Sequence, residues 1–360
     1  MLSQSKMDFK HKNILIISPE PWHHIHVSKH HYALELARNG AHVFFLNPPA
    51  HVWQCLDTSQ DNLKVVDYSG FWPGLYRLPG VFRRANQRAV LRKLKELVQC
   101  HFDIVWSFDN SVFYDMEVFG SAFKISHIVD LSQDFQTARA ARSADLCLGV
   151  IPKIVDRLRR YNDNTYLIKH GVHIYPCSEQ VTLPGDGKVK ALYFGNLKMP
   201  HLDWSLLRNA AMTHAEVDFV LLGSGHESVP ADVSSLLNVH LLYPVPSEDL
   251  SCYMNAADIL LLFYQKEYYM NYASPHKMME YLSSGKPIVA SYTADYKQHE
   301  DLIQMARTQE EWLEELAKTI DLQEKGEEQS LAARRISLCY SNAYDQKVGY
   351  IGGLISSLEV

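Results

Sequence analysis

The sequence predicts an α/β protein made of two doubly wound, Rossmann-like domains with a ligand-binding cleft between them. Three observations support this prediction. The chain has 360 residues, which is more than one hydrophobic core usually organises. Short, mostly apolar runs alternate with helical patterns, as expected of parallel strands that are covered on both faces. The alternation stops once, between Pro176 and Lys188, and then restarts.

The first domain is predicted over residues 1–178. Its opening strand is Asn13–Ser18, and a helix follows with Ser28 as its N-cap and Asn39-Gly40 as its stop signal. Further strands are expected at 42–46, 103–108, 124–129, 146–150 and 166–169.

A linker is expected over residues 179–188, because Pro176 to Lys188 contain two prolines, Gly185 and Gly187 and no hydrophobic periodicity. The second domain is predicted over residues 189–335. Its strands are expected at 189–194, 217–222, 239–242, 259–263 and 287–291. Residues 336–360 are expected to form a C-terminal helix that packs back on the first domain.

Composition places the chain among ordinary soluble proteins, with 47% apolar and 21% charged residues. The net charge of -6 argues against a general nucleic-acid binder. The six cysteines form no CxxC pair, so reduced thiols in a cytoplasmic protein are predicted. The polar start of the chain and the lack of an apolar run of about 20 residues predict neither a signal peptide nor a membrane span.

The ligand site is expected beyond the carboxyl ends of the strands, where open α/β sheets bind ligands. Gly195, Asn196 and Lys198 follow the first strand of the second domain. The glycine would let the backbone approach a ligand, and the lysine would supply positive charge. An ordinary tight turn with a solvated lysine is the alternative. Gly223 and Gly225 follow the next strand as an incomplete dinucleotide fingerprint, which a plain loop also explains and which argues against a dehydrogenase.

The segment Ser274–Pro287 is more informative. Ser274 can cap a helix and Pro275 suits its first turn, so free N–H groups at the helix N-terminus would favour a phosphate. Lys277 lies in that first turn, where a cation opposes the helix dipole and therefore indicates a bound anion. Glu280 could accept hydrogen bonds from a sugar or ribose diol. The alternative is a capped surface helix with an ion pair between Lys277 and Glu280.

The block Ser274-Pro-x-Lys-x-x-Glu-Tyr-Leu-x-x-Gly-Lys-Pro-Ile-Val resembles the GT-B glycosyltransferases of the large retaining family 4. It is particularly similar to the bacterial branch that makes teichuronic-acid-type and other surface polysaccharides. The resemblance covers residues 100–295 well and the rest loosely. Other matching positions are Asp203-Trp204, 217–223, 238–240, Ala257-Asp258, 127–130, 143–145 and 170–172.

The resemblance implies a donor site for a nucleotide sugar, transfer with retention, and neither a cofactor nor a metal for the chemistry. Lys198 and Lys277 would stabilise the leaving phosphate, and Asp130 would face the reacting sugar. Tyr272 stands where the family has a glutamate, which changes the expected contact with the sugar. The implied donor-binding residues are Gly195, Asn196, Lys198, Gly223, Gly225, Tyr243, Pro244, Val245, Tyr272, Ser274, Pro275, His276, Lys277, Met278 and Glu280.

A histidine-rich loop follows the first strand and contains His23, His24, His26, His30 and His31. His26 and His30 have a spacing that could hold a metal on a helix. Polar loop and helix-surface histidines, or acceptor-side contacts by His24 and His26, are the alternatives.

Residues 77–95 carry many cations and no acidic residue, and apolar residues lie between the charges. A basic amphipathic helix of this kind can lie on anionic lipid. A solvated helix face is the alternative.

Together these features predict a cytoplasmic glycosyltransferase, peripheral at the inner face of the membrane if residues 77–95 contact lipid. It would move a sugar from a UDP- or GDP-sugar to a glycan or lipid-linked acceptor in surface polysaccharide synthesis. A nucleotide-sugar hydrolase or epimerase would need carboxylates for acid–base work, and only Asp130 and Glu280 stand out. A non-catalytic donor-binding scaffold is the third alternative, motivated by Tyr272.

Overall fold

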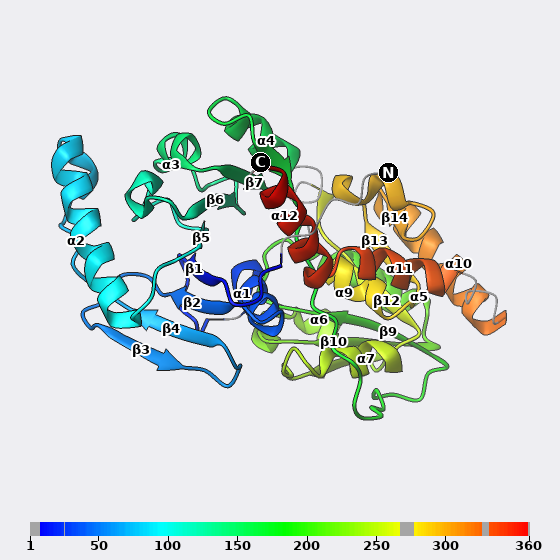
Figure 1. Ribbon diagram of the computed structural model, residues 1–360. Helices are drawn as coiled ribbons and strands as arrows, with labels where there is room; N and C mark the ends of the chain where they lie inside the picture. Colours follow the sequence, from blue (N-terminus) through cyan, green and yellow to red (C-terminus); the bar gives the residue numbers. More distant parts are fainter. Residues whose placement is uncertain (1–7, 25, 267–276, 326–330, 359–360) are drawn as a thin grey trace. The chain divides into compact units, whose positions relative to one another are not determined.

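The computed structural model describes residues 8–24, 26–266, 277–325 and 331–358, which form two compact α/β units (Figure 1). Unit 1 comprises Met1–Gly171 and Tyr344–Val360, and unit 2 comprises Val172–Ala343. These boundaries differ from the predicted ones at residues 178 and 335. In each unit, buried apolar strands form the core and helices cover the sheet, so the α/β class is confirmed.

Unit 1 is built on an eight-stranded sheet in the order β3-β4-β2-β1-β5-β6-β7-β8. All neighbouring strands are parallel except β3 and β4. The strand order reverses between β1 and β5, and such a switch point is where doubly wound sheets bind ligands. Sequence reasoning missed β3 and β4. The strands are β1 (Asn13–Ile17), β2 (His42–Leu46), β3 (Gln54–Asp57), β4 (Leu63–Asp67), β5 (Ile104–Ser107), β6 (Phe123–Ile128), β7 (Leu146–Gly149) and β8 (Thr165–Leu167).

The helices of unit 1 cover both faces of this sheet. The α-helices are α1 (Ser28–Arg38), α2 (Gly80–Val98), α3 (Thr137–Ser143), α4 (Pro152–Arg159) and α12 (Tyr344–Leu358), and the short 3-10 helices are η1 (Leu75–Arg77) and η2 (Met116–Phe119). The N-cap of α1 is Val27 and not the predicted Ser28, because Ser28 is already the first helical residue and Val27 is extended. The Val27 N–H donates to His30 Nδ1 at 3.2 Å. The helix ends at Asn39, as predicted, and Gly40 has a φ of +82°.

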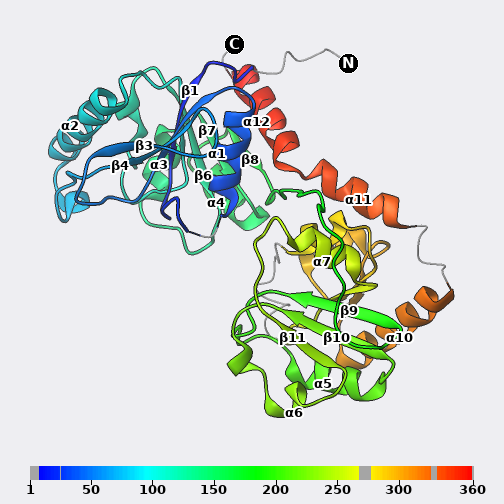
Figure 2. The ribbon, with the colours of Figure 1, turned by 90° about the horizontal axis from the view of Figure 1, so that it is seen from below.

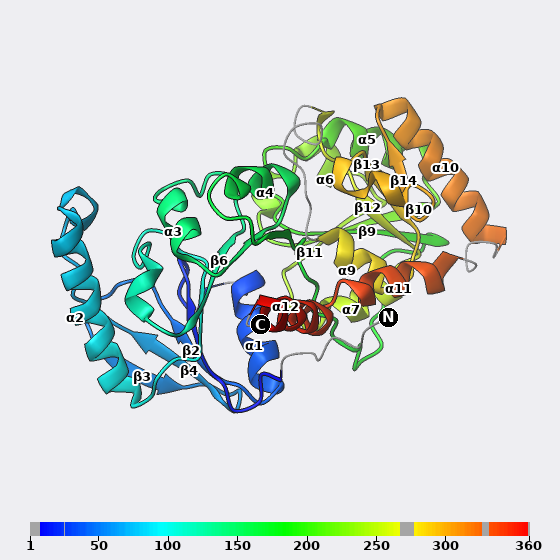
Figure 3. The ribbon, with the colours of Figure 1, turned by 45° about the horizontal axis from the view of Figure 1, so that its top comes forward.

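Unit 2 has a six-stranded, wholly parallel sheet in the order β11-β10-β9-β12-β13-β14. Its switch point lies between β9 and β12. The strands are β9 (Val189–Phe194), β10 (Val217–Leu222), β11 (Val239–Leu242), β12 (Ile259–Leu262), β13 (Ile288–Ser291) and β14 (Gln304–Ala306). The helices are α5 (Trp204–Thr213), η3 (His226–Ser228), α6 (Ala231–Ser234), α7 (Leu250–Ala256), α9 (Lys277–Ser283), η4 (Ala294–His299), α10 (Gln309–Lys325) and α11 (Ala332–Ser341). Helix α10 packs on β13 and β14 (Figure 3).

The C-terminal segment, predicted as one helix over 336–360, is two helices in different units. Helix α11 packs on α9 in unit 2, whereas α12 lies alongside α1 in unit 1 (Figure 2). The break falls at Asn342 and Ala343, between the two helices. Ile351 and Ile355 of α12 are buried in the core of unit 1.

The predicted linker is packed against unit 2. The Gly187 N–H donates to Asp218 Oδ2 at 2.7 Å, and Leu183 is buried in the core of the unit. A disulfide joins Cys177 to Cys252 of α7, with their Cα atoms 4.8 Å apart. The prediction of six reduced cysteines is therefore wrong for these two. A separation of 75 residues hides such a pair in the sequence, since only the tertiary fold brings its members together.

Among the described residues, no helix is long and apolar enough to cross a bilayer.

Candidate functional site

Two glycine-containing loops meet at the carboxyl ends of β9 and β10. The Leu197 N–H donates to the Ser224 carbonyl at 2.8 Å. A Cβ atom on Gly223 would lie 1.7 Å from the Gly195 carbonyl oxygen, so only glycine allows the two backbones to come this close. A Cβ atom on Gly225 would lie 2.5 Å from Cγ of Lys198. The three predicted glycines therefore build one tight floor at the strand ends.

Lys277 lies directly beneath this floor. Its Nζ donates to Tyr193 Oη and to the Phe194 carbonyl, both at 2.9 Å, and lies 4.1 Å from the centre of the Tyr193 ring. A Cβ atom on Gly195 would lie 2.5 Å from the same Nζ. Burial lowers the pKa of Lys277 to about 7, although the nearby Glu280 carboxylate opposes the shift. The amine is therefore poised to gain its proton when an anion binds beside it.

The helix that carries Lys277 is fixed to the sheet by Tyr281. Tyr281 Oη donates to the Leu261 carbonyl at 2.9 Å and accepts from the Phe194 N–H at 3.4 Å. Burial raises the pKa of Glu280, and the positive charge of Lys277 partly offsets this rise. Because α9 is anchored at the switch point between β9 and β12, both titratable groups are held in a fixed place at the strand ends.

The structure separates the remaining donor-site predictions. The side chain of Met278 is wholly buried in the core, so the predicted donor contact at this position would be made by its backbone. An α-helical residue one position after Lys277 faces a different direction, which places this side chain against the sheet. Tyr272, Ser274, Pro275 and His276 lie outside the described residues.

Lys198 is exposed and already has a carboxylate partner. Its Nζ lies 2.6 Å from Glu227 Oε1, and its backbone N–H donates to the Asn196 side chain at 2.9 Å. A phosphate at this position would have to compete with Glu227 for the lysine. The ammonium group of Lys198 can therefore change its partner, whereas that of Lys277 is held in one place.

An aromatic pair stands at the end of β11. The Tyr243 ring is exposed and its centre lies 4.7 Å from that of His226. His226 Nε2 donates to the Leu242 carbonyl at 3.0 Å, which fixes the imidazole beside the loop. Pro244 is also exposed and Val245 is half-buried. The exposed Tyr243 ring offers an apolar face on which another planar ring can stack.

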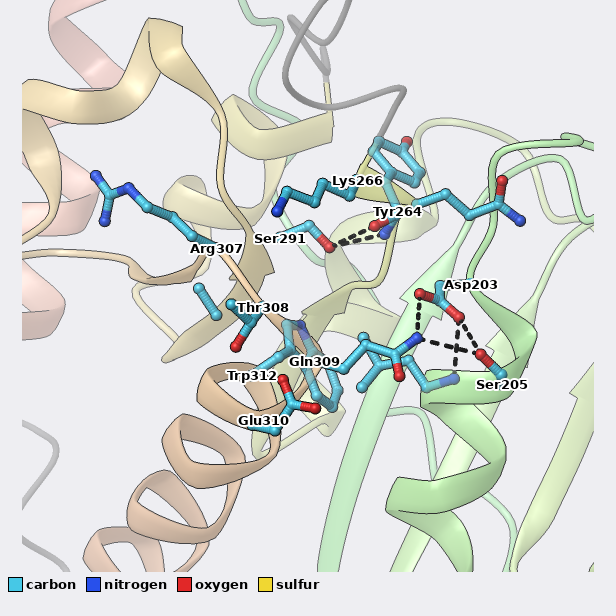
Figure 4. Close-up of a pocket in the computed structure, with 13 residues that line it drawn as sticks. Asp203, Ser205, Tyr264, Lys266, Ser291, Arg307, Thr308, Gln309, Glu310 and Trp312 are labelled. Atoms are coloured by element: carbon cyan, nitrogen blue, oxygen red, sulfur yellow. Dashed lines mark hydrogen bonds between the residues drawn. The ribbon is translucent and has the colours of Figure 1, made fainter.

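A polar cavity of about 530 Å³ opens at the carboxyl ends of β12, β13 and β14 (Figure 4). Asp203 accepts from Gln309 Nε2 at 2.8 Å and from Ser205 Oγ at 2.7 Å. Tyr264 lines the cavity, and its ring centre lies 5.8 Å from Lys277 Nζ. Tyr264 is therefore a neighbour of both the cavity and the lysine. Sequence reasoning used Asp203 only as part of the family resemblance.

Unit 1 contains buried basic residues that sequence reasoning missed. Lys29 is buried and pairs with Glu20. Burial lowers the pKa of Lys347 to about 8. Burial and the charges of His170, Lys347 and Lys29 hold the pKa of His127 well below its usual range. Residues so far apart in the chain carry no common sequence signal, but His127 stands at a strand end three residues before Asp130 and could have been found there.

Asp130 follows β6 in an exposed loop, at the strand end where it was predicted. Its Oδ1 accepts from both the backbone N–H and Oγ of Ser132 at 2.8 Å. The carboxylate is thus ordered by its own loop and open to solvent.

The histidine-rich loop is organised around a buried member. His30 is wholly buried, which contradicts its prediction as a loop or helix-surface residue. Its Nε2 donates to the Pro21 carbonyl at 3.2 Å, its Nδ1 accepts from Val27, and burial lowers its pKa to about 4. Both ring nitrogens are used, so His30 is not placed to share a metal with His26. His24 and His26 are exposed, and within the described ranges no group of three or more metal-ligating side chains occurs.

Comparison with known proteins assigns this architecture. Residues 188–321 match the family model described as glycosyl transferases group 1. The Bacillus subtilis (strain 168) protein TuaH, provisionally named a teichuronic acid biosynthesis glycosyltransferase, is 25% identical over 172 residues. That alignment covers 44% of this chain and 43% of TuaH, so the chain spans less than half the length of this relative.

Solved structures match almost the whole chain at low identity. A sucrose-phosphate synthase from Thermosynechococcus elongatus has a TM-score of 0.68 at 14% identity, covering 97% of this chain and 99% of its own. A trehalose-6-phosphate structure from E. coli, bound with UDP-2-fluoro glucose, has a TM-score of 0.61 at 10% identity, covering 97% and 99%. Anabaena HepE in complex with UDP and glucose has a TM-score of 0.58 at 14% identity, covering 95% and 99%. Residues 188–321 are therefore a glycosyltransferase domain of group 1, set in a chain with the two-unit GT-B fold.

Proposed function

We propose that this chain transfers a sugar from a nucleoside-diphosphate sugar to an acceptor, and that unit 2 binds the donor. The observation that carries the proposal is Lys277, held beneath Gly195 at the strand ends with a pKa lowered to about 7. A diphosphate on the glycine floor would draw a proton onto this amine, and the resulting ion pair would be shielded from water.

The chemistry assigned to the site is charge stabilisation. The bond between the sugar C1 and the phosphate oxygen breaks, and a bond from C1 to the acceptor oxygen forms. The acceptor hydroxyl proton passes to an oxygen of the leaving phosphate. Lys277, with Lys198 released from Glu227, would stabilise the negative charge that grows on that phosphate. Asp130 of unit 1 is proposed to balance positive charge on the sugar. The scheme uses no cofactor and no metal, and transfer with retention is part of the proposal.

UDP-sugars are the first donors to test. Two of the structures with this fold are described with UDP-2-fluoro glucose or with UDP and glucose, which supports testing UDP-sugars before GDP-sugars. The exposed Tyr243 and its neighbour His226 are proposed to stack on the base, and Glu280 to accept hydrogen bonds from the ribose.

The acceptor is proposed to be a glycan or a lipid-linked glycan used in surface polysaccharide synthesis, at the cytoplasmic face of a membrane. The support is the name of TuaH, which refers to teichuronic acid biosynthesis. Disulfides persist mainly in oxidising compartments, so an intact Cys177–Cys252 bond in cells would argue against a cytoplasmic location. Alkylating free thiols in intact cells before lysis tests it, since a reduced pair is expected in a cytoplasmic protein.

The first experiment is a thermal-unfolding panel with UDP, GDP, CMP and their sugars. A ligand present at about 100 times its Kd stabilises the native state by about 2.7 kcal/mol, which raises the Tm of a unit this size by roughly 5–10 °C. UDP compounds are expected to give this shift, and Lys277→Met is expected to reduce it. Product analysis follows. A glycoside supports transfer, free sugar or an epimer supports a hydrolase or epimerase, and binding without turnover supports a scaffold.

A further inference from the structure

Unit 1 exposes a cluster of large apolar side chains, here named the aromatic tip. Its members are between 40% and 78% exposed. They come from the segment before α2, from its first turn, and from the loop that follows β6. The ring centres of Tyr76 and Phe135 lie 5.2 Å apart, which brings the segment before α2 and the loop after β6 together. The aromatic tip comprises Trp72, Tyr76, Val81, Phe82 and Phe135. An exposed apolar cluster of this kind marks an interaction surface.

The aromatic tip is continuous with a positively charged face of α2. This helix buries Val90, Leu91 and Leu94 against unit 1. Arg88 and Arg92 are four residues apart, exposed, and therefore on one side of the helix. Figure 1 shows α2 along the outside of the sheet of unit 1.

Neutralising carboxylates are scarce around these cations. Arg84 lies 2.6 Å from Asp115 and 3.1 Å from Glu117. In the part of the chain that the structure describes, Arg84 is the only cation between residues 77 and 95 that has a carboxylate within 4.0 Å. The side of α2 that carries Arg88 and Arg92 is therefore positively charged, although Asp134 is exposed in the loop of Phe135 and Glu96 is exposed one turn after Arg92. This side complements an anionic partner.

The C-terminal part of the basic stretch has a structural role. Lys93 Nζ lies 4.5 Å from the centre of the Trp53 ring, and α2 packs there on β3. Arg83, near the start of the helix, donates to the Leu78 carbonyl at 2.6 Å and orders the turn below the aromatic tip. Lys93 and Arg83 are therefore used within unit 1, so the contact surface is narrower than the whole range 77–95 expected from the sequence.

We propose that the aromatic tip docks unit 1 on an anionic phospholipid bilayer. Tryptophan and tyrosine rings are stable at the headgroup level, since one edge is apolar and the other polar. Arg88 and Arg92 would then lie close to the lipid phosphates, where each cation adds to the attraction. The surrounding positive charge favours a lipid surface over an uncharged protein partner.

Docking at this place also bears on the acceptor, a consequence that rests on the proposed glycosyl transfer. Phe135 belongs to the same short loop as Asp130, which ties that carboxylate to the aromatic tip. A lipid-linked acceptor in the bilayer would thus be presented next to Asp130 without leaving the membrane.

The test is co-sedimentation with vesicles of phosphatidylcholine, with and without a one-third share of phosphatidylglycerol. The full chain is expected to bind only the anionic vesicles. The double variant Arg88→Ser/Arg92→Ser should bind about 30-fold more weakly, since each cation near an anionic surface contributes about a fivefold factor. Val81→Asp/Phe82→Asp should abolish binding, because it places two carboxylates in the lipid contact.

Matched controls separate this surface from general effects. Arg159→Ser/Arg160→Ser changes the net charge by the same amount at an exposed place in the same unit and should leave binding unchanged. Leu237→Asp replaces a fully exposed leucine in unit 2 and should also have no effect. Equal binding by the wild type and the tip variants, or equal losses in the controls, would overturn the proposal.

Two further readings keep the proposals distinct. The Tm shift with UDP should persist in all tip variants, because unit 2 is unchanged. If the wild type binds vesicles but shows no Tm shift with UDP, only the proposed function is refuted. If it shows the Tm shift but does not bind vesicles, only the docking is refuted. Light scattering measures whether the chain self-associates, and so tests whether the aromatic tip binds another protein molecule instead of lipid. Self-association that disappears in Val81→Asp/Phe82→Asp, without vesicle binding by the wild type, would assign the aromatic tip to a protein interface instead.

Discussion

Replacing Lys277 with methionine should change how donor binding depends on pH. Methionine keeps the length of the side chain and removes its charge. The pKa of Lys277 is lowered to about 7, so at pH 8 about nine-tenths of the amines in the empty site are neutral. A diphosphate beside Nζ favours the charged form and raises this pKa again. Binding of the donor at pH 8 is therefore expected to take up about 0.9 protons.

Titration calorimetry measures this uptake directly. UDP-glucose is the suitable ligand, because its diphosphate does not titrate near pH 8. Repeating the titration in buffers of different ionisation enthalpy gives the number of protons taken up. The wild-type affinity should also fall about tenfold for each pH unit above the pKa of Lys277. Lys277→Met should bind more weakly, take up no proton and show no such slope. Lys198→Met is the control, since Lys198 is exposed and its loss should leave the uptake unchanged.

A second reading of the same variant needs no donor. In the unfolded chain the pKa of a lysine is about 10.4, so between pH 7 and that value the unfolded state binds more protons than the folded state. Stability should therefore rise with pH over this window. Each unit of difference between the unfolded and folded pKa corresponds to about 1.36 kcal/mol, so the total rise is about 5 kcal/mol. Lys277→Met should lose this rise in urea unfolding. Proton uptake that persists in Lys277→Met, or parallel stability curves for wild type and variant, would refute the assignment.

Three further predictions concern the packing of unit 2. Gly223→Ala should cost about 1–3 kcal/mol in urea unfolding and abolish the Tm shift with UDP, because its Cβ would collide with the neighbouring loop. Gly353→Ala, where the added Cβ meets nothing, is the control and should be neutral or stabilising, so equal losses would count against this reasoning. Cys252→Ser should lower the stability by about 2–4 kcal/mol in oxidising buffer and by much less with dithiothreitol, whereas equal effects in both buffers would argue against the disulfide. Asp218→Asn should cost about 3 kcal/mol at pH 7, because it leaves Lys190 without its buried partner. Burial alone would raise the pKa of Asp218, but the hydrogen bonds it accepts lower the pKa overall. The difference in unfolding free energy between wild type and Asp218→Asn should therefore shrink as the pH falls below about 4. A difference that stays constant with pH would contradict this reasoning.

Much of the fold was predictable because buried parallel strands leave a strong local pattern. The runs that became β9 and β10 are apolar except for Lys190 and Asp218, and the structure places both at the predicted residues. The strand β3 was missed, since Gln54–Asp57 is mostly exposed and carries little apolar signal. The strand β4 was also missed, although Leu63, Val65 and Val66 are buried in it. The linker was misread for a related reason. Glycines and prolines look alike in a flexible segment and in one that is packed on Asp218.

The candidate site was predictable only in part. Gly195, Gly223 and Lys277 follow strands or begin a helix, and their positions are visible in the chain. The sequence could not show that Lys277 Nζ lies against Gly195, nor that Lys198 forms an ion pair with Glu227. The sequence also could not show that Lys29 and Lys347 lie near His127, because the three residues are far apart along the chain.

The sequence by itself determined the α/β class, the division into two parts and the glycines and lysine of the donor-side loops. These properties follow from local periodicity, turn chemistry and order along the chain. Only the tertiary structure decided which charges are buried, which cysteines meet, and where the C-terminal segment divides between the units. The pKa of Lys277, the Cys177–Cys252 bond and the aromatic tip all depend on contacts between residues far apart in the sequence. Such contacts are set by packing, which no local pattern encodes.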